Sequence, residues 1–487
     1  MDGRDPEGRR LPICIDSTSN GEFEPIALTA RNERGNRLAQ QHAGDLARRK
    51  GLGRRAFLMS ACGAASTLLA INKVNAEAGL TGGWFDIPAD AAFEEAAAES
   101  VLNGEEFIFD VQGHYVNPEG AWLGRVSQHA RPFSWVPNPC VRAAGTETRE
   151  YLECLRAEEF IKDVFLDSDT DMMVLSFVPS SRDDEPVTIE EADQTRRIVE
   201  AMEGDHRLML HGRVNPNQPG DLEDMSRLAD NFPISAWKTY TQWGPSGHGF
   251  YLTDDVGERF IAEARRLGVR NIAIHKGLPF GRRSYAHSLC TDIGPAAKRH
   301  PDINFIVYHS GFEPRVRETA FVNDGKEAGI DVLVRSLRDS GVTPNSNVYA
   351  ELGSTWRFLM RDPEQAAHVV GKLLLACGED NVLWGTDSIW YGSPQDQIQA
   401  FRTFQIADSL REARGYPELT PQLRAKIFGL NAARPYGIGP DEVRKRAGAR
   451  DAIAQRRQAY AVQPDPSFTT YGPRNRREFL TFKRLGG

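Results

Sequence analysis

The sequence predicts a (β/α)8 barrel with a disordered N-terminal leader and a helical, irregular C-terminal extension. Three observations predict it: short apolar runs recur eight times, helix-like segments separate them, and polar residues stand where the runs end. A strand followed by a helix, repeated eight times, is the pattern of a closed parallel barrel. The expected strands are Phe107–Val111, Met172–Phe177, Leu208–Val214, Ile234–Tyr240, Asn271–His275, Phe305–His309, Val348–Glu351 and Val382–Asp387.

Amphipathic segments between these runs have the period of helices that cover a barrel. They are Ile189–Glu203, Asp254–Leu267, Val332–Asp339, Pro363–Ala376 and Gln395–Ala413. A doubly wound sheet is the alternative, but that fold needs no eighth strand. A long insertion with Trp122, Trp135 and several prolines follows the first strand.

The region before the barrel divides into three parts. Residues 1–53 are polar and lack apolar periodicity, so we expect a disordered leader. Residues 54–78 resemble a twin-arginine export signal: Arg54 and Arg55 precede an uncharged stretch with a small-residue cleavage site after Ala76. A buried or membrane-anchoring helix is the alternative for this stretch. A linker (79–104) leads to the barrel (105–438), and a C-terminal helix and tail (439–487) follow it.

The composition narrows the classes of partner. The chain of 487 residues carries a formal net charge of −8, which gives no reason to expect nucleic acid. We expect a small-molecule substrate, no membrane contact beyond export, and a periplasmic or exported location, or a cytoplasmic one if the signal is not functional. The tail more often packs on its own barrel or on a sister subunit, so homo-oligomerisation stays open.

Polar residues suited to metal or proton chemistry end six of the eight expected strands. They are Gln112 and His114 (first strand), Lys238 (fourth), His275 (fifth), His309 (sixth), Glu351 (seventh) and Asp387 (eighth). Gln112 and His114 are two residues apart, so on an extended strand they point the same way. The carboxyl ends of barrel strands meet at one mouth, where such residues become neighbours. Because charged side chains are costly to bury unless they are paired or coordinating, this placement predicts a functional site.

Five sequence motifs, in order and at barrel spacing, resemble the amidohydrolase superfamily and its amidohydrolase-2 group. They are FDVQGHY, NIAIHKG, FIVYHSG, VLWGTDS and the closing KIFGLNAARPYGI, which together span Phe107 to about Gly437. The group contains metal-dependent hydrolases, hydratases and decarboxylases. In it, two histidines of the first strand, the histidine of the fifth and the aspartate of the eighth hold one divalent metal ion.

The resemblance implies that His114, His275 and Asp387 are metal ligands, and that His309 and Asp387 are catalytic. Gln112 departs from the pattern, because it stands where the first ligand histidine should be. An amide oxygen is a neutral and harder donor than imidazole, so the change weakens a zinc site and favours manganese or iron in relative terms. We expect one divalent ion, with zinc first and manganese or iron as alternatives, and Gln112 as a substituted ligand.

Aromatic residues near the same strand ends, among them Trp237, Tyr240 and Trp356, suggest a pocket for a planar substrate, although packing of the helical shell is the alternative. Lys238, Trp243, Glu351 and Trp390 are the expected substrate-binding residues. The expected function is hydrolysis of a carbonyl-containing small molecule, with aromatic molecules among the candidates, by metal-activated water. Two alternatives remain: non-oxidative decarboxylation at the same site, and a metal-free lactonase or a non-catalytic binding barrel, which Gln112 motivates.

Overall fold

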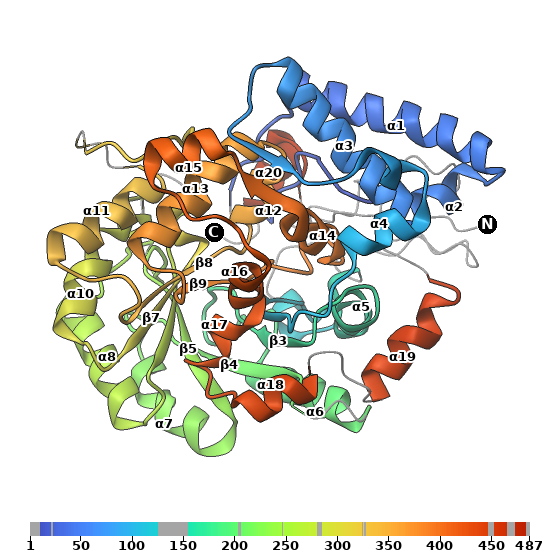
Figure 1. Ribbon diagram of the computed structural model, residues 1–487. Coiled ribbons are helices and arrows are strands. Elements are labelled where there is room, and N and C mark those ends of the chain that lie inside the picture. Colours follow the sequence, from blue (N-terminus) through green and yellow to red (C-terminus); the bar gives the residue numbers. More distant parts are fainter. Residues whose placement is uncertain are drawn as a thin grey trace.

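The predicted barrel is confirmed by a computed structural model of the chain, which describes residues 10–20, 23–124, 154–202, 206–245, 247–279, 285–323, 325, 328–446, 452–464 and 473–483. Eight parallel strands form one sheet in chain order, and helices surround it (Figure 1). The strands are β2 (Phe109–Gly113), β3 (Met172–Leu175), β4 (Leu208–Arg213), β5 (Ile234–Tyr240), β6 (Asn271–His275), β7 (Asn304–Tyr308), β8 (Val348–Glu351) and β9 (Val382–Leu383). Most of their side chains are buried on both faces, as in other parallel sheets.

The barrel closes between its first and last strands. The amide N–H of Val111 donates to the carbonyl of Trp384 (3.1 Å), and that of Asp387 donates to the carbonyl of Gln112 (3.0 Å). A parallel bridge joins Gly113 to Ser388 just beyond. This seam holds the ends of β2 and β9 side by side, and the first and last functional motifs with them.

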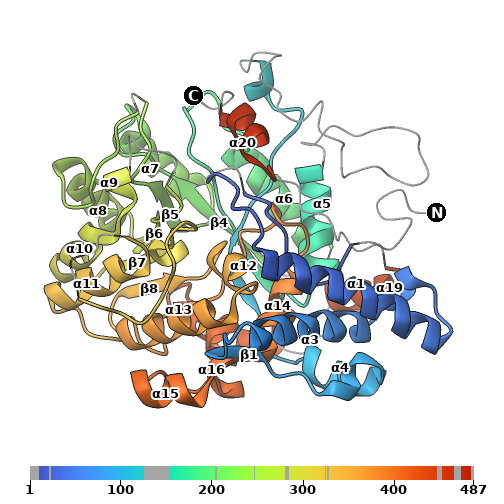
Figure 2. The ribbon, with the colours of Figure 1, turned by 90° about the horizontal axis from the view of Figure 1, so that it is seen from above.

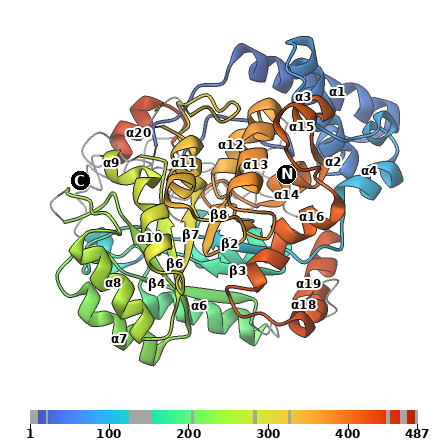
Figure 3. The ribbon, with the colours of Figure 1, turned by 60° about the vertical axis from the view of Figure 1, so that its left-hand side comes forward.

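Helices on the outside of the barrel follow the strands (Figure 3). They are α5 (Ala157–Ile161) with the π-turn η5 (Lys162–Leu166), α6 (Ile189–Ala201), α7 (Asp221–Asn231), α8 (Asp255–Arg266), α9 (Tyr285–Ser288), η6 (Cys290–Asp292), α10 (Ile293–Arg299), α11 (Ile330–Ser340), α12 (Thr355–Leu359), α13 (Pro363–Ala376) and α14 (Gln395–Thr403). Local signals fix their starts. Thr188 and Glu191 form a capping box at α6, and Asp362 caps α13 ahead of Pro363.

One predicted helix is wrong in its extent. The segment Gln395–Ala413 is not continuous, because β10 (Phe404–Ile406) interrupts it between α14 and α15 (Asp408–Arg414). β10 pairs in antiparallel fashion with β1 (Gly83–Phe85), a strand that precedes the barrel. The tertiary pairing of this ribbon outweighs the local helical pattern.

The chain after α15 packs against the barrel. It comprises α16 (Pro421–Ala425), the π-helix η8 (Lys426–Leu430), α17 (Asn431–Ala433), α18 (Pro440–Arg446), α19 (Ala452–Ala461) and α20 (Arg476–Lys483). Asn431 donates to the carbonyl of Val382 (2.8 Å), and Tyr436 packs in the interior cluster with Phe109. The motif predicted to end the barrel therefore does so.

The N-terminal region differs from the disordered leader expected for residues 1–53. Ala30–Lys50 forms helix α1, and α2 (Arg54–Leu58) and α3 (Ala61–Glu77) follow it (Figure 2). Ala39, Ala43 and Ala47 recur every four residues on the buried face of α1, which packs against α3. The periodicity is that of small residues, so a search for large apolar side chains misses it.

The stretch predicted as an export signal forms α3, whose apolar residues are buried in the main core. Before the barrel the chain continues through η1 (Ala89–Ala92) and α4 (Glu95–Leu102), and η2 (Ala121–Gly124) lies in the insertion after β2. Among the described residues, no helix combines the length and the apolar character that crossing a membrane requires. The export signal itself stays a prediction.

Leu68→Ala tests whether α3 is part of the folded core. Leu68 is fully buried, so we expect the variant to lose about 2–5 kcal/mol of unfolding free energy. Urea denaturation of the full chain measures the loss. Leu52→Ala, at an exposed leucine, is the control and should change stability by less than ~0.5 kcal/mol. Equal, small effects of both substitutions would mean that α3 does not pack on the protein.

Candidate functional site

The polar residues at the strand ends lie together inside the mouth of the barrel. Gln112, His114, His275, His309 and Asp387 are each at most 2% exposed. His309 and Asp387 have φ values of 62° and 61°, in the left-handed region that few residues other than glycine adopt. Such conformations persist only where the surrounding structure holds them, and they concentrate at functional sites.

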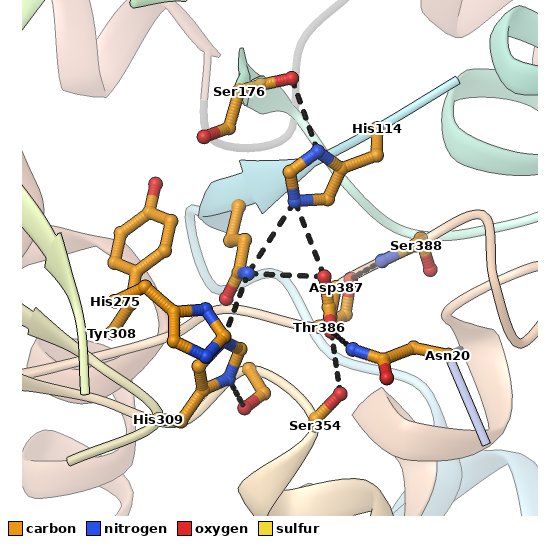
Figure 4. Close-up of polar contacts among 12 residues, drawn as sticks. Asn20, His114, Ser176, His275, Tyr308, His309, Ser354, Thr386, Asp387 and Ser388 are labelled. Atoms are coloured by element: carbon orange, nitrogen blue, oxygen red, sulfur yellow. Dashed lines mark hydrogen bonds and ion pairs between the residues drawn. The ribbon is translucent and has the colours of Figure 1, made fainter. Parts of the chain in front are cut away.

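Asp387 is the centre of the hydrogen-bond network (Figure 4). Its Oδ1 lies 3.2 Å from Nε2 of His114 and accepts a hydrogen bond of 3.0 Å from Nε2 of Gln112. Its Oδ2 accepts from Nδ2 of Asn20 (2.8 Å) and from the hydroxyl of Ser354 (2.5 Å). Burial alone would raise the pKa of Asp387, but the hydrogen bond and charge of His114, with His309 and Ser354, outweigh burial and hold this pKa below its usual range.

His114 is held at both ring nitrogens. Its Nδ1 lies 3.1 Å from the carbonyl oxygen of Ser176, which can only accept, so Nδ1 carries a proton. Its Nε2 faces the ionised carboxylate of Asp387, which also only accepts. Nε2 also lies 3.4 Å from Nε2 of Gln112, so both ring nitrogens of His114 have polar neighbours. The indole of Trp390 stacks on this ring, with centroids 5.6 Å apart.

The side-chain amide of Gln112 occupies the middle of the cluster. Its Nε2 lies 3.0 Å from Asp387 Oδ1, 3.4 Å from His114 Nε2 and 3.5 Å from His309 Nε2. The reverse amide orientation would set two acceptor oxygens 3.0 Å apart, so the nitrogen is the atom that faces Asp387. Oε1 of Gln112 has no hydrogen-bond partner among the described residues, and it lies so close to Gly353 that any side chain at position 353 would collide with it.

The two histidines on the other side of the amide are neutral. Nδ1 of His309 donates to the carbonyl of Gly353 (2.6 Å), which leaves Nε2 as an acceptor. Nδ1 of His275 lies 3.2 Å from that Nε2. Burial lowers the pKa of His309 to about 4, and burial followed by the charges of His309 and Lys238 lowers the pKa of His275 well below its usual value.

Two buried carboxyl groups brace the backbone around the cluster. Glu351 accepts from the amide N–H groups of His309 (2.9 Å) and Gly353 (2.5 Å), and burial raises its pKa to about 8. Asp110 accepts from the amide N–H groups of Gln112 (3.0 Å) and Thr386 (3.1 Å), and burial raises its pKa to about 7. These carboxyl groups fix the strand ends that present the site.

Lys238 brings positive charge to the same cavity wall. Its ammonium group lies 3.6 Å from the ring centre of Tyr308 and 4.6 Å from that of Tyr240, and the residue is fully buried. The ring of Tyr240 in turn stacks on His275 at 4.6 Å. The charge of Lys238 contributes to the lowered pKa values of His211, His275 and His309, which shows that it acts on all three rings.

Most of the predicted site residues lie in or beside one network. Gln112, His114, His309 and Asp387 contact one another, His275 joins through His309, and Glu351 and Trp390 support the cluster. Trp243 is half-buried, and no contact described for its ring joins it to the network.

Sequence reasoning missed Asn20, Ser176 and Ser354. Ser354 follows Glu351 closely and could have been found at a strand end, whereas nothing in the sequence marks Asn20.

Comparison with family models gives a match over part of the chain. Residues 238–438 match the sequence model of the amidohydrolase family, which the motifs in this part of the chain predicted. The match begins at Lys238, so Gln112 and His114 lie outside it.

Solved structures resemble the chain at low sequence identity. One is a probable 2-pyrone-4,6-dicarboxylic acid hydrolase from Acinetobacter baumannii with bound citric acid (13% identity, TM-score 0.41, 68% of this chain and 99% of that one). Another is an amidohydrolase from Burkholderia multivorans with bound zinc (15%, 0.40, 68% and 100%). A third is 5-carboxyvanillate decarboxylase from Novosphingobium aromaticivorans with bound manganese (14%, 0.40, 68% and 97%). The search of curated proteins found no match.

The residues of this site do not fit the metal ion that the family implies. The predicted ligands of such an ion are His114, His275 and Asp387, with Gln112 as the substituted ligand. The atom that Gln112 presents to these side chains is Nε2, which lies 3.0–3.5 Å from Asp387 Oδ1, His114 Nε2 and His309 Nε2, and an amide NH2 group has no lone pair to offer a metal ion. Within the described residues, no group of three or more His, Cys, Asp or Glu side chains is arranged to hold a metal ion.

The raised pKa of Glu351 gives a pH dependence that can be measured. Below the unfolded value (near 4.5) Glu351 is protonated in both states, and between that value and about 8 only the unfolded state ionises. The stability that protonated Glu351 retains at low pH is therefore lost as the pH rises to about 8, by up to ~1.4 kcal/mol per pH unit.

Glu351→Gln removes this titration. We expect the difference in unfolding free energy between the variant and the parent to change steadily in the variant's favour from pH 5 to 8, as measured by urea denaturation at each pH. Glu364→Gln, on the outer helix α13, is the matched control and should give a flat difference. A flat difference for Glu351→Gln as well would mean that Glu351 is ionised in the folded protein.

Proposed function

We propose that the protein is a hydrolase of the amidohydrolase type that opens a small ester or lactone without a bound metal ion. One observation supports the proposal: the ionised carboxylate of Asp387 lies 3.2 Å from Nε2 of His114, and the amide of Gln112 contacts both side chains. The expected metal-dependent route is the alternative, and the predicted zinc, manganese or iron ion stays untested.

In the proposed reaction Asp387 is the general base. Its carboxylate is ionised throughout the neutral range, and Oδ1 faces the interior of the mouth. Oδ1 accepts a proton from a water molecule while the water oxygen forms a bond to the substrate's carbonyl carbon. The low pKa makes Asp387 a weak base. Its contribution is therefore that the carboxylate is always ionised and is held next to the attacking water.

His114 is the partner acid. In the reacting state Nε2 of His114 carries a proton, and it donates this proton to the oxygen that leaves when the C–O bond breaks. The proton taken up by Asp387 then returns to His114 across their 3.2 Å contact, and the site is restored. One water is consumed, and an acid and a hydroxyl group are formed.

Three further residues orient the reacting groups and supply electrostatic stabilisation: Gln112, His309 and Lys238. His309 accepts a hydrogen bond from the Gln112 amide and keeps the amide directed toward Asp387, so we assign His309 a positioning role. Lys238 supplies positive charge that attracts the carbonyl oxygen as it becomes negative. Trp390, stacked on His114, offers a flat wall that suits a planar substrate.

A product-labelling screen tests the reaction class. The full chain is incubated in ¹⁸O-labelled water with chromogenic and cyclic esters, including 4-nitrophenyl acetate and dihydrocoumarin. We expect one labelled oxygen in the acid product. Release of carbon dioxide from hydroxybenzoic acids, without label in the product, would instead establish decarboxylation.

Asp387→Asn should lower kcat for a hydrolysed ester by a factor on the order of 10²–10⁴, because the amide cannot accept the water proton. Steady-state kinetics measure the loss. Asp45→Asn, on an exposed face of α1, is the matched control and should leave kcat unchanged. Retained turnover in Asp387→Asn would remove Asp387 from the mechanism.

The metal content of the purified chain separates the two routes. We expect the parent to hold far less than one zinc, manganese or iron ion per chain by elemental analysis, and to keep its activity in a strong chelator. Gln112→His replaces the central amide with an imidazole and should bind about one zinc ion per chain after loading, because it completes a nitrogen and carboxylate ligand set. A parent that carries about one tightly bound ion and loses activity with it would refute the metal-free route.

A further inference from the structure

A segment far from the barrel in sequence lies over the mouth. Within residues 10–20, Asn20 lies beside Asp387, at the carboxyl end of the last strand (Figure 4). Ile13 and Ile15 are buried in the main core. The segment is thus packed into the protein rather than lying along its surface.

Buried polar contacts hold the segment in one place. Arg357, in the helix after β8, donates to the carbonyl of Cys14 and to Asp16 (3.2 Å). The amide N–H of Cys14 donates to Asp396 (3.1 Å), and Nδ2 of Asn36 donates to the carbonyl of Ile15 (2.8 Å). Arg357 and Asp396 are only 6% and 7% exposed, so the segment satisfies groups that would be costly to leave buried and unpaired.

The end of the segment reaches the reacting carboxylate. Asn20 is 8% exposed, and its Nδ2 donates to Oδ2 of Asp387 at 2.8 Å. The Ser354 hydroxyl donates to the same oxygen, and its own oxygen lies 2.7 Å from the hydroxyl of Tyr391. Two donors on Oδ2 prevent rotation of the carboxylate, so Oδ1 stays directed toward His114 and Gln112. Asn20 does this without adding a charge beside Asp387.

We propose that Asn20 is a positioning residue for Asp387 and that residues 10–20 are a working part of the site. The proposal builds on the hydrolase function proposed above. It assigns a role to a segment that the sequence marks only as a polar leader, and it requires the functional chain to keep residues that cleavage after Ala76 would remove. The loss of Asn20 should slow the chemical step, because Oδ1 is no longer fixed, and should leave substrate binding nearly unchanged.

A spectroscopic test needs no substrate. The full chain is labelled with ¹⁵N-asparagine, and the side-chain amide signal of Asn20 is assigned by its loss in Asn20→Ala. We expect Asp387→Asn to move this signal, because a charged acceptor becomes neutral, whereas Asp45→Asn leaves it in place. An Asn20 signal that does not respond to Asp387→Asn, or that shows the shift of a solvent-exposed amide or is lost to exchange with water, would overturn the proposal.

A kinetic test uses the ester identified by the ¹⁸O screen. Asn20→Ala should lower kcat roughly tenfold with little change in KM. Asn36→Ala is the matched control, since it removes a hydrogen bond from the same segment at a point away from Asp387. Equal losses in both variants would mean that docking of the segment, and not the contact with Asp387, matters, and would overturn the positioning role.

The two proposals fail in different ways. If no ester is hydrolysed, the proposed function fails, and the NMR response alone decides whether Asn20 holds Asp387. If an ester is hydrolysed and Asn20→Ala is as active as the parent, the function stands and the role of Asn20 is refuted.

Discussion

The buried carboxylate of Asp387 is the constraint on which the site depends. An ion in this interior is stable only if donors surround it, and here His114, Gln112, Asn20 and Ser354 do so. The four donors come from three parts of the chain, so the charge ties together the end of the first strand, the loop after β8 and the N-terminal segment. The left-handed backbone at Asp387 is tolerated because these contacts and the seam between β2 and β9 hold it.

Burial inside the barrel explains why the other ionisable side chains of the site are neutral. Around the one strong negative charge, burial keeps His275 and His309 uncharged and favours the protonated form of Glu351. Lys238 adds the compensating positive charge from β5.

The periodicity of apolar runs was enough to predict all eight strands and the placement of His114, His275, His309 and Asp387 at their ends. The hydrogen bond from Asn20 could not be predicted, because it joins residues 367 positions apart and Asn20 lies in a polar stretch without a motif. Helix α1 was missed because its buried face is made of alanines. The sequence identified Gln112 as an exception, but only the structure shows that its amide nitrogen lies at the centre of the cluster.

The packing of residues 10–20 on the barrel affects when this segment can fold during synthesis. On the ribosome Asn20 is made early, and its acceptor follows only after nearly the entire barrel has been synthesised. Residues 10–20 therefore have no permanent place until the last strand has joined the first. Until then Ile13 and Ile15, which are buried in the folded protein, stay exposed to water and to other chains. The nascent chain therefore depends on rapid synthesis of the last strand, or on a chaperone that binds the N-terminal segment.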